Sequence, residues 1–215
     1  MQRAVREESK PSLRRRLLAA RTSVSSEQRR LWSGLIQGGA LRFAPYLAAN
    51  KVALYSPIDT EVETQAILAH ALASKKAVFF PRIGPDNSGW FFQVGAESDL
   101  RAGRFGINEP AGDLALPVQA QEIAEHTLIF VPGLAFDIDG YRLGRGGGAY
   151  DRMLTALKCQ AIFVGLAFEL QIMEQLPTDE WDQKIHYVIT EKRIIDCGAS
   201  ALCNRDRRAS CRERV

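Results

Sequence analysis

The sequence predicts an α/β protein of three layers, in which a mostly parallel β-sheet has helices on both faces. Two observations carry this prediction. Short apolar segments of strand length alternate along the chain with segments whose apolar residues recur every three or four positions, the helical period. The strand segments are apolar throughout rather than alternately polar, which is typical of parallel strands that helices bury on both sides.

Two helices are predicted near the N-terminus. Residues 11–21 begin with Pro11, which suits the first helical position because the N–H that it lacks would be unpaired there. Ser25 and Gln28 have the spacing of a capping box, so a second helix is expected to start after Ser25. The side chains expected to face the core from these two helices are Leu13, Leu17, Leu18, Leu31, Leu35 and Ile36.

The remaining elements alternate between helices and strands. A third helix is predicted within residues 61–75 and a fourth after Asp151, where Met153, Leu154 and Leu157 have core spacing. The predicted strands are residues 51–56, 77–81, 90–94, 127–132, 160–168 and 186–190. Elements in this order fit a sheet whose strands are joined by crossover helices.

Length and charge indicate one nearly neutral domain. The 215 residues, 46% of them hydrophobic, can form a full core, and no linker precedes residue 196, so residues 1–197 are predicted to be a single domain. Residues 198–215 lack apolar periodicity and are expected to be disordered. Residues 205–215 hold five arginines and two acidic residues; 28 basic minus five and 25 acidic minus two both leave 23. A surface for binding nucleic acid is therefore not indicated.

Other classes of protein are also disfavoured. The longest apolar run, near residues 128–136, is too short to span a bilayer, and the arginine-rich N-terminus lacks the apolar segment of a secretory signal. The four cysteines form no Cys-x-x-Cys pair, and the three histidines lack zinc-like spacing. We expect a cytoplasmic monomer with reduced thiols, Cys159 in the core and the others in or beside the tail: Cys197, Cys203 and Cys211.

Residues 131–154, VPGLAFDIDGYRLGRGGGAYDRML, carry most of the functional information. Three consecutive glycines, Gly146–Gly148, run into the predicted helix, where backbone N–H groups can bind an anion and the helix dipole favours it. Arg142 and Arg145 can add bidentate contacts to phosphate oxygens. Asp151 offers the hard oxygen ligand that a phosphate-bound Mg²⁺ needs. The segment predicts a phosphate site with a metal ligand beside it.

Two better-known phosphate motifs do not account for this segment. Gly144, Gly146 and Ala149 match the dinucleotide-binding fingerprint in letters, but ten or so loop residues separate them from the preceding strand. A Walker A loop needs Gly-Lys-Ser or Gly-Lys-Thr, which the sequence lacks. The ordinary alternative is a flexible glycine loop that binds nothing.

The same segment resembles the signature of the 5-formyltetrahydrofolate cyclo-ligase family, whose loop usually reads Gly-Tyr-Gly-Gly-Gly-Tyr-Tyr-Asp or Gly-Arg-Gly-Lys-Gly-Tyr-Tyr-Asp. The similarity extends from about Lys10 to about Ile195. Further landmarks follow in the family's order: Lys10-x-x-x-Arg14, Tyr55–Glu63, Phe80-Pro81-Arg82, Gly106-Ile107-x-Glu109-Pro110 and Leu176–Asp182.

The resemblance implies an enzyme of folate metabolism with small-molecule substrates. It implies ATP- and Mg²⁺-dependent closure of the 5-formyl group of 5-formyltetrahydrofolate onto N10, giving 5,10-methenyltetrahydrofolate, ADP and phosphate. The implied route is phosphorylation of the formyl oxygen followed by attack of N10. Phosphoryl transfer of this kind needs positioning and charge neutralisation rather than a protein nucleophile.

The resemblance also implies roles for individual residues, with Arg145 and Asp151 as the catalytic pair and Asp151 and Asp182 as Mg²⁺ ligands. The implied ATP contacts are Lys10, Arg14, Arg142, Leu143, Gly144, Arg145, Gly146, Gly147, Gly148, Ala149 and Tyr150. The implied folate contacts are Tyr55, Glu61, Arg145, Gly146, Gly147, Gly148 and Ala149.

Each of these assignments has an ordinary alternative. Lys10 and Arg14 project from one helical face, which could simply be solvated. Asp182 could be a turn carboxylate, and Glu61 an acid at the start of a helix. Tyr55 could pack in the sheet core. One further residue, Phe105, fits equally well as an aromatic near the substrate and as a core residue.

Ala149 departs from the family pattern, because the first tyrosine of Tyr-Tyr-Asp is missing. Loss of a ring against the folate favours a second hypothesis, a non-catalytic or weakly active paralogue that binds nucleotide or folate. Gly147 in place of lysine also removes one positive charge that would face phosphate. A third hypothesis, nucleic-acid binding by the arginine-rich ends, is disfavoured by the neutral body.

Overall fold

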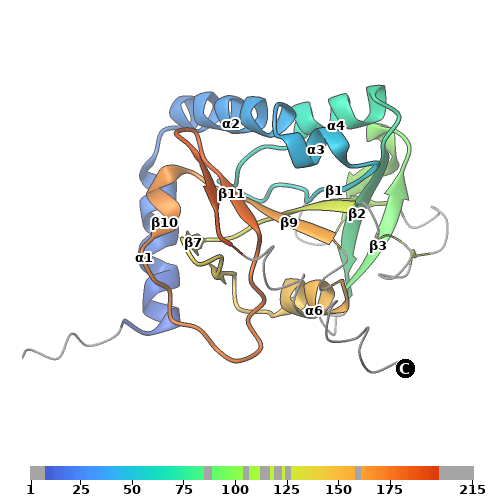
Figure 1. Ribbon diagram of the computed structural model, residues 1–215. Helices are drawn as coiled ribbons and strands as arrows, with labels where there is room; N and C mark the ends of the chain where they lie inside the picture. The colour runs from blue at the N-terminus through green and yellow to red at the C-terminus, as the bar shows by residue number, and fades with distance from the viewer. Residues whose placement is uncertain are drawn as a thin grey trace, which may run out of the picture.

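The computed structural model describes residues 8–84, 89–103, 107–111, 117–118, 123, 127–157 and 161–198. Within them, seven strands form the main sheet in the order β12-β11-β9-β6-β1-β2-β3 (Figure 1). Their bounds are β1 Lys51–Ala53, β2 Ala77–Ile83, β3 Gly89–Val94, β6 Thr127–Val131, β9 Ala161–Leu166, β11 Tyr187–Ile189 and β12 Ile194–Asp196. The inner strands pair in parallel, and β3 and β12 pair antiparallel at the two edges. The mostly parallel sheet is confirmed.

Helices cover both faces of this sheet, as predicted. Helices α2 Ser26–Leu41, α3 Ala44–Ala48 and α4 Gln65–Ala73 lie along one face, and α6 Ala149–Ala156 lies along the other (Figure 1). Strand β6 shows why two faces are needed. Leu128 and Phe130 enter the core beneath α2–α4, whereas Ile129 and Val131 enter the core beneath α6, because successive strand side chains point to opposite faces.

Helix α1, Lys10–Ser23, lies beside a second, smaller sheet (Figure 1). That sheet has the order β10-β7-β8, with β7 at Ala135–Asp137, β8 at Arg142–Leu143 and β10 at Ile172–Met173. Leu13 and Leu17 of α1 share a small apolar cluster with Ala135 and Leu143 of this sheet and with Leu176, which follows β10. Another pair of short strands, β4 Leu100–Ala102 and β5 Asn108–Pro110, is antiparallel.

The prediction that three leucines face the core is wrong. Leu31 is 59% exposed, Leu35 52% and Leu18 39%. The buried face of α2 instead includes the polar residues Ser33 and Gln37, whose oxygens accept the N–H groups of Glu63 and Ala66 at 3.3 and 2.8 Å. These amides lie at the beginning of α4 and need partners that leucine cannot supply.

Two details near the chain ends test the remaining predictions. Ser25 accepts a hydrogen bond from the backbone N–H of Gln28 at 3.2 Å, so α2 starts where the capping signal placed it. Cys197, expected as a solvated thiol beside the tail, packs against the core, and burial raises its pKa to about 12.

Several residues with predictions lie outside the described residues: Phe105, His126, Cys159, Cys203, Cys211 and the tail from residue 199. None of the described helices has the length and apolarity to cross a bilayer.

Candidate active site

The glycine loop connects β8 to α6 and takes a backbone shape that needs glycine. Gly146 has φ +105°, and Gly148 has φ +66° at the N-cap of α6, both in the region that residues with a Cβ rarely adopt. A Cβ on Gly146 would lie 3.5 Å from the guanidinium carbon of Arg14. The loop therefore passes closely under a cation at the start of a helix, as the anion-site prediction requires.

Helix α1 brings one cation to this loop and a second to the segment of Asp179 and Asp182, both from the other end of the sequence. Arg14 Nε donates to the carbonyl oxygen of Gly144 at 2.9 Å, and Lys10 Nζ lies 2.6 Å from Asp179 Oδ2 and 2.7 Å from Asp182 Oδ2. Although burial lowers it, the two carboxylates leave the pKa of Lys10 above its ordinary value. A simply solvated pair does not describe these side chains.

Arg142 lies in β8 and is buried, with its side chain 3% exposed. It donates to Asp151 Oδ1 at 2.7 Å and to the carbonyl oxygen of Gln183 at 3.0 Å. Burial lowers the pKa of Arg142, and the nearby carboxylates of Asp151 and Asp182 oppose that shift. The guanidinium is directed at a carboxylate of the site and not outward from the loop, so in this structure it orients Asp151.

Asp151 and Asp182 belong to one connected network. The N–H of Gln183, the residue after Asp182, lies 3.5 Å from Asp151 Oδ1. Asp182 Oδ2 accepts both Lys10 Nζ and the N–H of Asp179, at 2.7 and 2.9 Å. Among contacts between described residues, each carboxylate thus uses one oxygen and keeps the other for a further ligand.

Two unused carboxylate oxygens, one each from Asp151 and Asp182, are enough to hold Mg²⁺ together with water and phosphate. The described residues contain no group of three or more His, Cys, Asp or Glu side chains arranged to hold a metal. Mg²⁺ is usually bound by one or two carboxylates, with waters and substrate phosphates completing its shell, so a closed protein cage is not required.

Arg145 links the glycine loop to the loop before α4. It lies 3.1 Å from Asp59 Oδ2 and 3.5 Å from Glu61 Oε1, and its side chain is 44% exposed. Glu61 is buried and accepts the N–H of Ile58 at 3.1 Å. Burial raises the pKa of Glu61, while the Ile58 N–H, Arg21 and Arg145 act in the other direction. Because α4 begins at Gln65, Glu61 is not a helix-start acid.

Among the other residues expected around the folate, Gly146 and Gly147 are exposed, whereas Tyr55 and Ala149 are buried. Tyr55 is 2% exposed, packs in the core beneath α2–α4, and donates its hydroxyl to the Val62 carbonyl oxygen at 2.9 Å. Its ordinary alternative, core packing, describes this placement. Tyr150, expected as an ATP contact, packs against both core clusters, and burial raises its pKa. Ala149, the first residue of α6, is 9% exposed.

Sequence reasoning missed Arg21, which continues the helical face of Lys10 and Arg14. Its Nε donates to Thr60 Oγ1 at 2.8 Å and its Nη1 to the Gly133 carbonyl oxygen at 3.3 Å. Its Nη2 is buried without a hydrogen-bond partner in the described part of the chain. The spacing of seven from Arg14 was the available signal, because such residues share a helical face.

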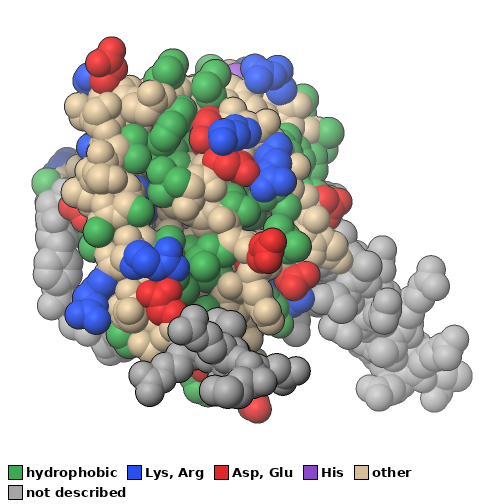
Figure 2. Space-filling view, turned by 90° about the vertical axis from the view of Figure 1, so that its left-hand side faces the viewer, with side chains coloured by type: hydrophobic (Ala, Val, Ile, Leu, Met, Phe, Trp, Pro, Cys, Tyr) green, Lys and Arg blue, Asp and Glu red, His purple; other side chains and the backbone are tan. Residues whose placement is uncertain are grey.

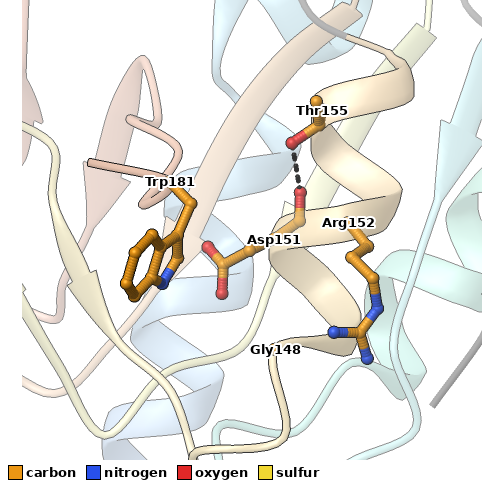
Figure 3. A pocket seen from close by; sticks show the side chains of 5 residues that line it. All are labelled: Gly148, Asp151, Arg152, Thr155 and Trp181. Carbon is orange, nitrogen blue, oxygen red and sulfur yellow. Dashed lines mark hydrogen bonds between the residues drawn. The ribbon is translucent and has the colours of Figure 1, made fainter. Parts of the chain in front are cut away.

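Two surface pockets flank the glycine loop. One, of about 280 Å³, is lined by Gly148, Asp151, Arg152, Thr155 and Trp181 (Figure 3). The other, of about 220 Å³, is lined by Arg14, Arg15, Leu18, Leu134 and Arg145. The second pocket explains the exposure of Leu18. On the face shown in Figure 2, basic and acidic side chains are interspersed rather than gathered into a single patch.

Comparison with known proteins decides the family. A model of the 5-formyltetrahydrofolate cyclo-ligase family matches residues 6–191. The chain belongs to this family. The 5-formyltetrahydrofolate cyclo-ligase of Escherichia coli K12 is 32% identical over 161 residues, covering 72% of this chain and 85% of that relative. The Mus musculus 5-formyltetrahydrofolate cyclo-ligase is 30% identical over 191 residues, covering 85% and 94%.

Solved structures show the same fold. The NMR structure of Aquifex aeolicus 5,10-methenyltetrahydrofolate synthetase superposes with a TM-score of 0.76 at 34% identity, over 87% of this chain and 92% of that one. A 5,10-methenyltetrahydrofolate synthetase from Mycoplasma pneumoniae has a TM-score of 0.68 at 22% identity, covering 86% and 99%. The three-layer fold, the family and the assignment as a cyclo-ligase enzyme are confirmed, and the family indicates conversion of 5-formyltetrahydrofolate to 5,10-methenyltetrahydrofolate. The roles of single residues stay predictions.

Proposed function

We propose that this cyclo-ligase uses ATP and Mg²⁺ to convert 5-formyltetrahydrofolate into 5,10-methenyltetrahydrofolate, with release of ADP and phosphate. One observation carries the proposal. Cations from α1, a glycine loop with left-handed residues and two carboxylates with unused oxygens lie in one hydrogen-bonded network, although up to 172 positions separate them in sequence. Phosphate, metal and counter-charge would meet there.

The phosphates of ATP would bind at the N-terminus of α6. Backbone N–H groups of Gly146–Gly148 and the helix dipole favour an anion, and Arg14 stands over the loop. Arg145 is the cation best able to move, since its ion pairs are long and its side chain is 44% exposed. The pair with Asp59, whose side chain is 62% exposed, is of the weak, solvated kind, so Arg145 can leave Asp59 for the transferring phosphoryl group and stay near Glu61.

Asp151 and Asp182 would hold Mg²⁺ through the oxygens that Arg142 and Lys10 do not occupy. When bound, the ion offsets negative charge on the phosphates. Arg142 fixes the Asp151 carboxylate, and Lys10 fixes the Asp182 turn, so both ligands are oriented before the nucleotide arrives.

The chemistry then needs placement rather than a protein nucleophile. The formyl oxygen attacks the γ-phosphorus as the bond to ADP breaks. The N10 lone pair attacks the activated formyl carbon, phosphate leaves with the former formyl oxygen, and the N10 proton passes to solvent. Holding both reactants in line and neutralising the charge on the phosphates together supply most of the rate enhancement in reactions of this class. Glu61 would accept hydrogen bonds from the pterin ring, with its charge supported by Arg145.

The test follows the absorbance of methenyltetrahydrofolate with 5-formyltetrahydrofolate, ATP and Mg²⁺, each omitted in turn. Product should form only in the complete mixture, with one ADP and one phosphate for each product. Tight binding of ATP or folate without turnover would instead support a weakly active paralogue, the alternative that Ala149 favours. Turnover without ATP would overturn the proposal.

A further inference from the structure

A short turn beside the glycine loop holds a tryptophan in solvent. Trp181 is 68% exposed, the highest value among the large exposed hydrophobic side chains of the described residues. It lies between Asp179 and Asp182, which are joined by an N–H to carbonyl hydrogen bond of 3.1 Å. An indole left in water forgoes the burial that normally stabilises large aromatic side chains, so its exposure beside a binding site points to a ligand surface.

The turn is held rigidly. The N–H of Asp179 donates to Asp182 Oδ2 at 2.9 Å, Lys10 Nζ contacts both carboxylates, and Gln183 Nε2 donates to the Trp181 carbonyl oxygen at 3.0 Å. The same lysine that is expected to serve the ATP phosphates thus also fixes the segment that presents the indole. Because the backbone of the turn is already fixed, it loses little conformational freedom when a ligand stacks on the indole.

The indole forms one side of the pocket of about 280 Å³ at the start of α6. In Figure 3 its ring lies opposite the Asp151 carboxylate, with Gly148 and Arg152 on the helix beyond. Asp151 is the proposed metal ligand, so phosphates sharing that ion would lie at the edge of this pocket. The nucleoside part of the same molecule is then within reach of Trp181.

From these contacts we infer that Trp181 forms the nucleobase subsite, on which the adenine of ATP stacks. This inference rests on the proposed function, which it extends from the phosphates to the base. The two pockets beside the glycine loop explain why the base and not the pterin is the occupant. Arg145, which contacts the proposed pterin acceptor Glu61, lines the other pocket, whereas Asp151 and Trp181 line this one. The two sides of the glycine loop would therefore serve different ligands.

The experiment compares ADP with tripolyphosphate, which has the phosphate chain but no base. Dissociation constants are measured by calorimetry in Mg²⁺ for wild type, Trp181→Ala, Trp181→Phe and the control Trp90→Ala, whose side chain is also exposed, at 45%. Trp181→Ala should weaken ADP about tenfold, as for loss of one aromatic stacking contact, and leave tripolyphosphate within about twofold. Trp181→Phe should stay within about threefold for ADP, and Trp90→Ala should change neither ligand.

Equal weakening of ADP and tripolyphosphate, or no weakening of either, would overturn the subsite. So would a tenfold rise in the dissociation constant of 5-formyltetrahydrofolate with ADP unaffected, since the indole would then face folate. Failure of the proposed function is recognised separately, because wild-type protein would bind ADP without forming methenyltetrahydrofolate. If wild type binds no ADP at all, both are overturned.

Discussion

The two arginines that flank the glycine loop differ in almost every physical respect. Arg142 is in a strand, 3% exposed, and bound to a carboxylate and a carbonyl group at 2.7 and 3.0 Å. Arg145 is in the loop itself, 44% exposed, and paired at 3.1 and 3.5 Å with two carboxylates of another loop. Three positions of sequence separate a fixed cation from a movable one.

The comparison indicates which tasks each region can perform. A buried guanidinium with short contacts cannot turn toward a ligand without leaving its own charge and that of its partner unpaired, so Arg142 maintains geometry. An exposed guanidinium with long contacts can exchange partners at little cost, so Arg145 can follow charge that develops during a reaction. The predictions below test this division, from the largest expected effect to the smallest.

Asp151→Asn should have the largest effect, because Asp151 pairs with the buried Arg142 and is also the proposed Mg²⁺ ligand. We expect kcat to fall about 100-fold or more at limiting Mg²⁺, since one charged ligand is lost. The unfolding free energy should also fall, by about 1–2 kcal/mol, because Arg142 loses its anionic partner. Activity titrated with Mg²⁺ and urea unfolding measure the two effects. Asp139→Asn, at an exposed turn, is the control. Wild-type turnover at limiting Mg²⁺ would remove Asp151 from the metal site.

Arg142→Met should act mainly on stability. The substitution removes a buried cation and its hydrogen bonds to Asp151 and to the Gln183 carbonyl group. We expect the unfolding free energy to fall by about 2–3 kcal/mol, less than for a fully buried pair because Asp151 can still be hydrated. Urea denaturation of Arg142→Met beside Arg145→Met measures the contrast. Equal losses in the two variants would contradict the division between fixed and movable cations.

Arg145→Met should act mainly on turnover. Its pair with Asp59 is exposed and its contact with the buried Glu61 is long, at 3.5 Å, so the unfolding free energy should change by about 1 kcal/mol or less. The value of kcat/KM for ATP should fall about 10- to 100-fold, with kcat contributing, because a guanidinium binds the transferring group more tightly than the ground state. Steady-state kinetics over a range of ATP concentrations provide the measurement. Unchanged ATP kinetics would show that Arg145 does not contact the phosphates.

Acid should weaken folate binding through Glu61. Burial raises its pKa above the ordinary 4.5, so kcat/KM for 5-formyltetrahydrofolate should fall as the pH drops through that raised pKa. In Arg145→Met the fall should start at higher pH, since a cation that favours the ionised form is gone. Glu61→Gln should abolish this limb of the profile; its persistence there would assign the limb to another group.

Protonation of Glu61 should affect folding stability in the opposite direction to its effect on folate binding. Because the folded state favours protonated Glu61, the stabilisation linked to that proton is present below pH 4.5 and is lost as the pH rises through the raised pKa. Protonation of Glu61 should therefore lower the activity of the wild type without destabilising its fold. The midpoint of urea unfolding, measured across the same pH range as the kinetics, separates the two.

How far the sequence predicts this molecule depends on the range of the interactions. Apolar strands such as Thr127–Val131 and the helix start at Ser25 follow from local pattern, and the structure has them where expected. The exposure of Leu31 and Leu35 does not follow, because it depends on which backbone amides of α4 need Ser33 and Gln37. Spacing along a helix gives a face but not the identity of the surface that it meets.

The site shows the same limit. The glycine loop and the position of Asp151 beside it could be predicted from one continuous segment. The different tasks of Arg142 and Arg145 could not, because burial depends on the β10-β7-β8 sheet, whose two- and three-residue strands carry too few residues for a period to be recognised. Trp181 could not be singled out either, because the turn that presents its indole is held by Lys10, a residue at the other end of the chain.

The smallest expected effect lies at Ala149, on α6 between the movable Arg145 and the fixed Asp151. If this side chain faces the folate, Ala149→Tyr restores a ring that most family members have. Stacking on the pterin or aminobenzoyl group should add about 0.5–1.5 kcal/mol, which lowers the Michaelis constant for 5-formyltetrahydrofolate several-fold and leaves that for ATP unchanged. Ala149 is only 9% exposed, so the added ring would have to occupy part of the space in which the substrate binds. Ala149→Leu is the matched control, because it adds bulk without an aromatic face. A higher folate Michaelis constant in both variants would mean that the pocket is already filled and overpacks. An unchanged folate Michaelis constant in both variants would place the Ala149 side chain outside the folate site.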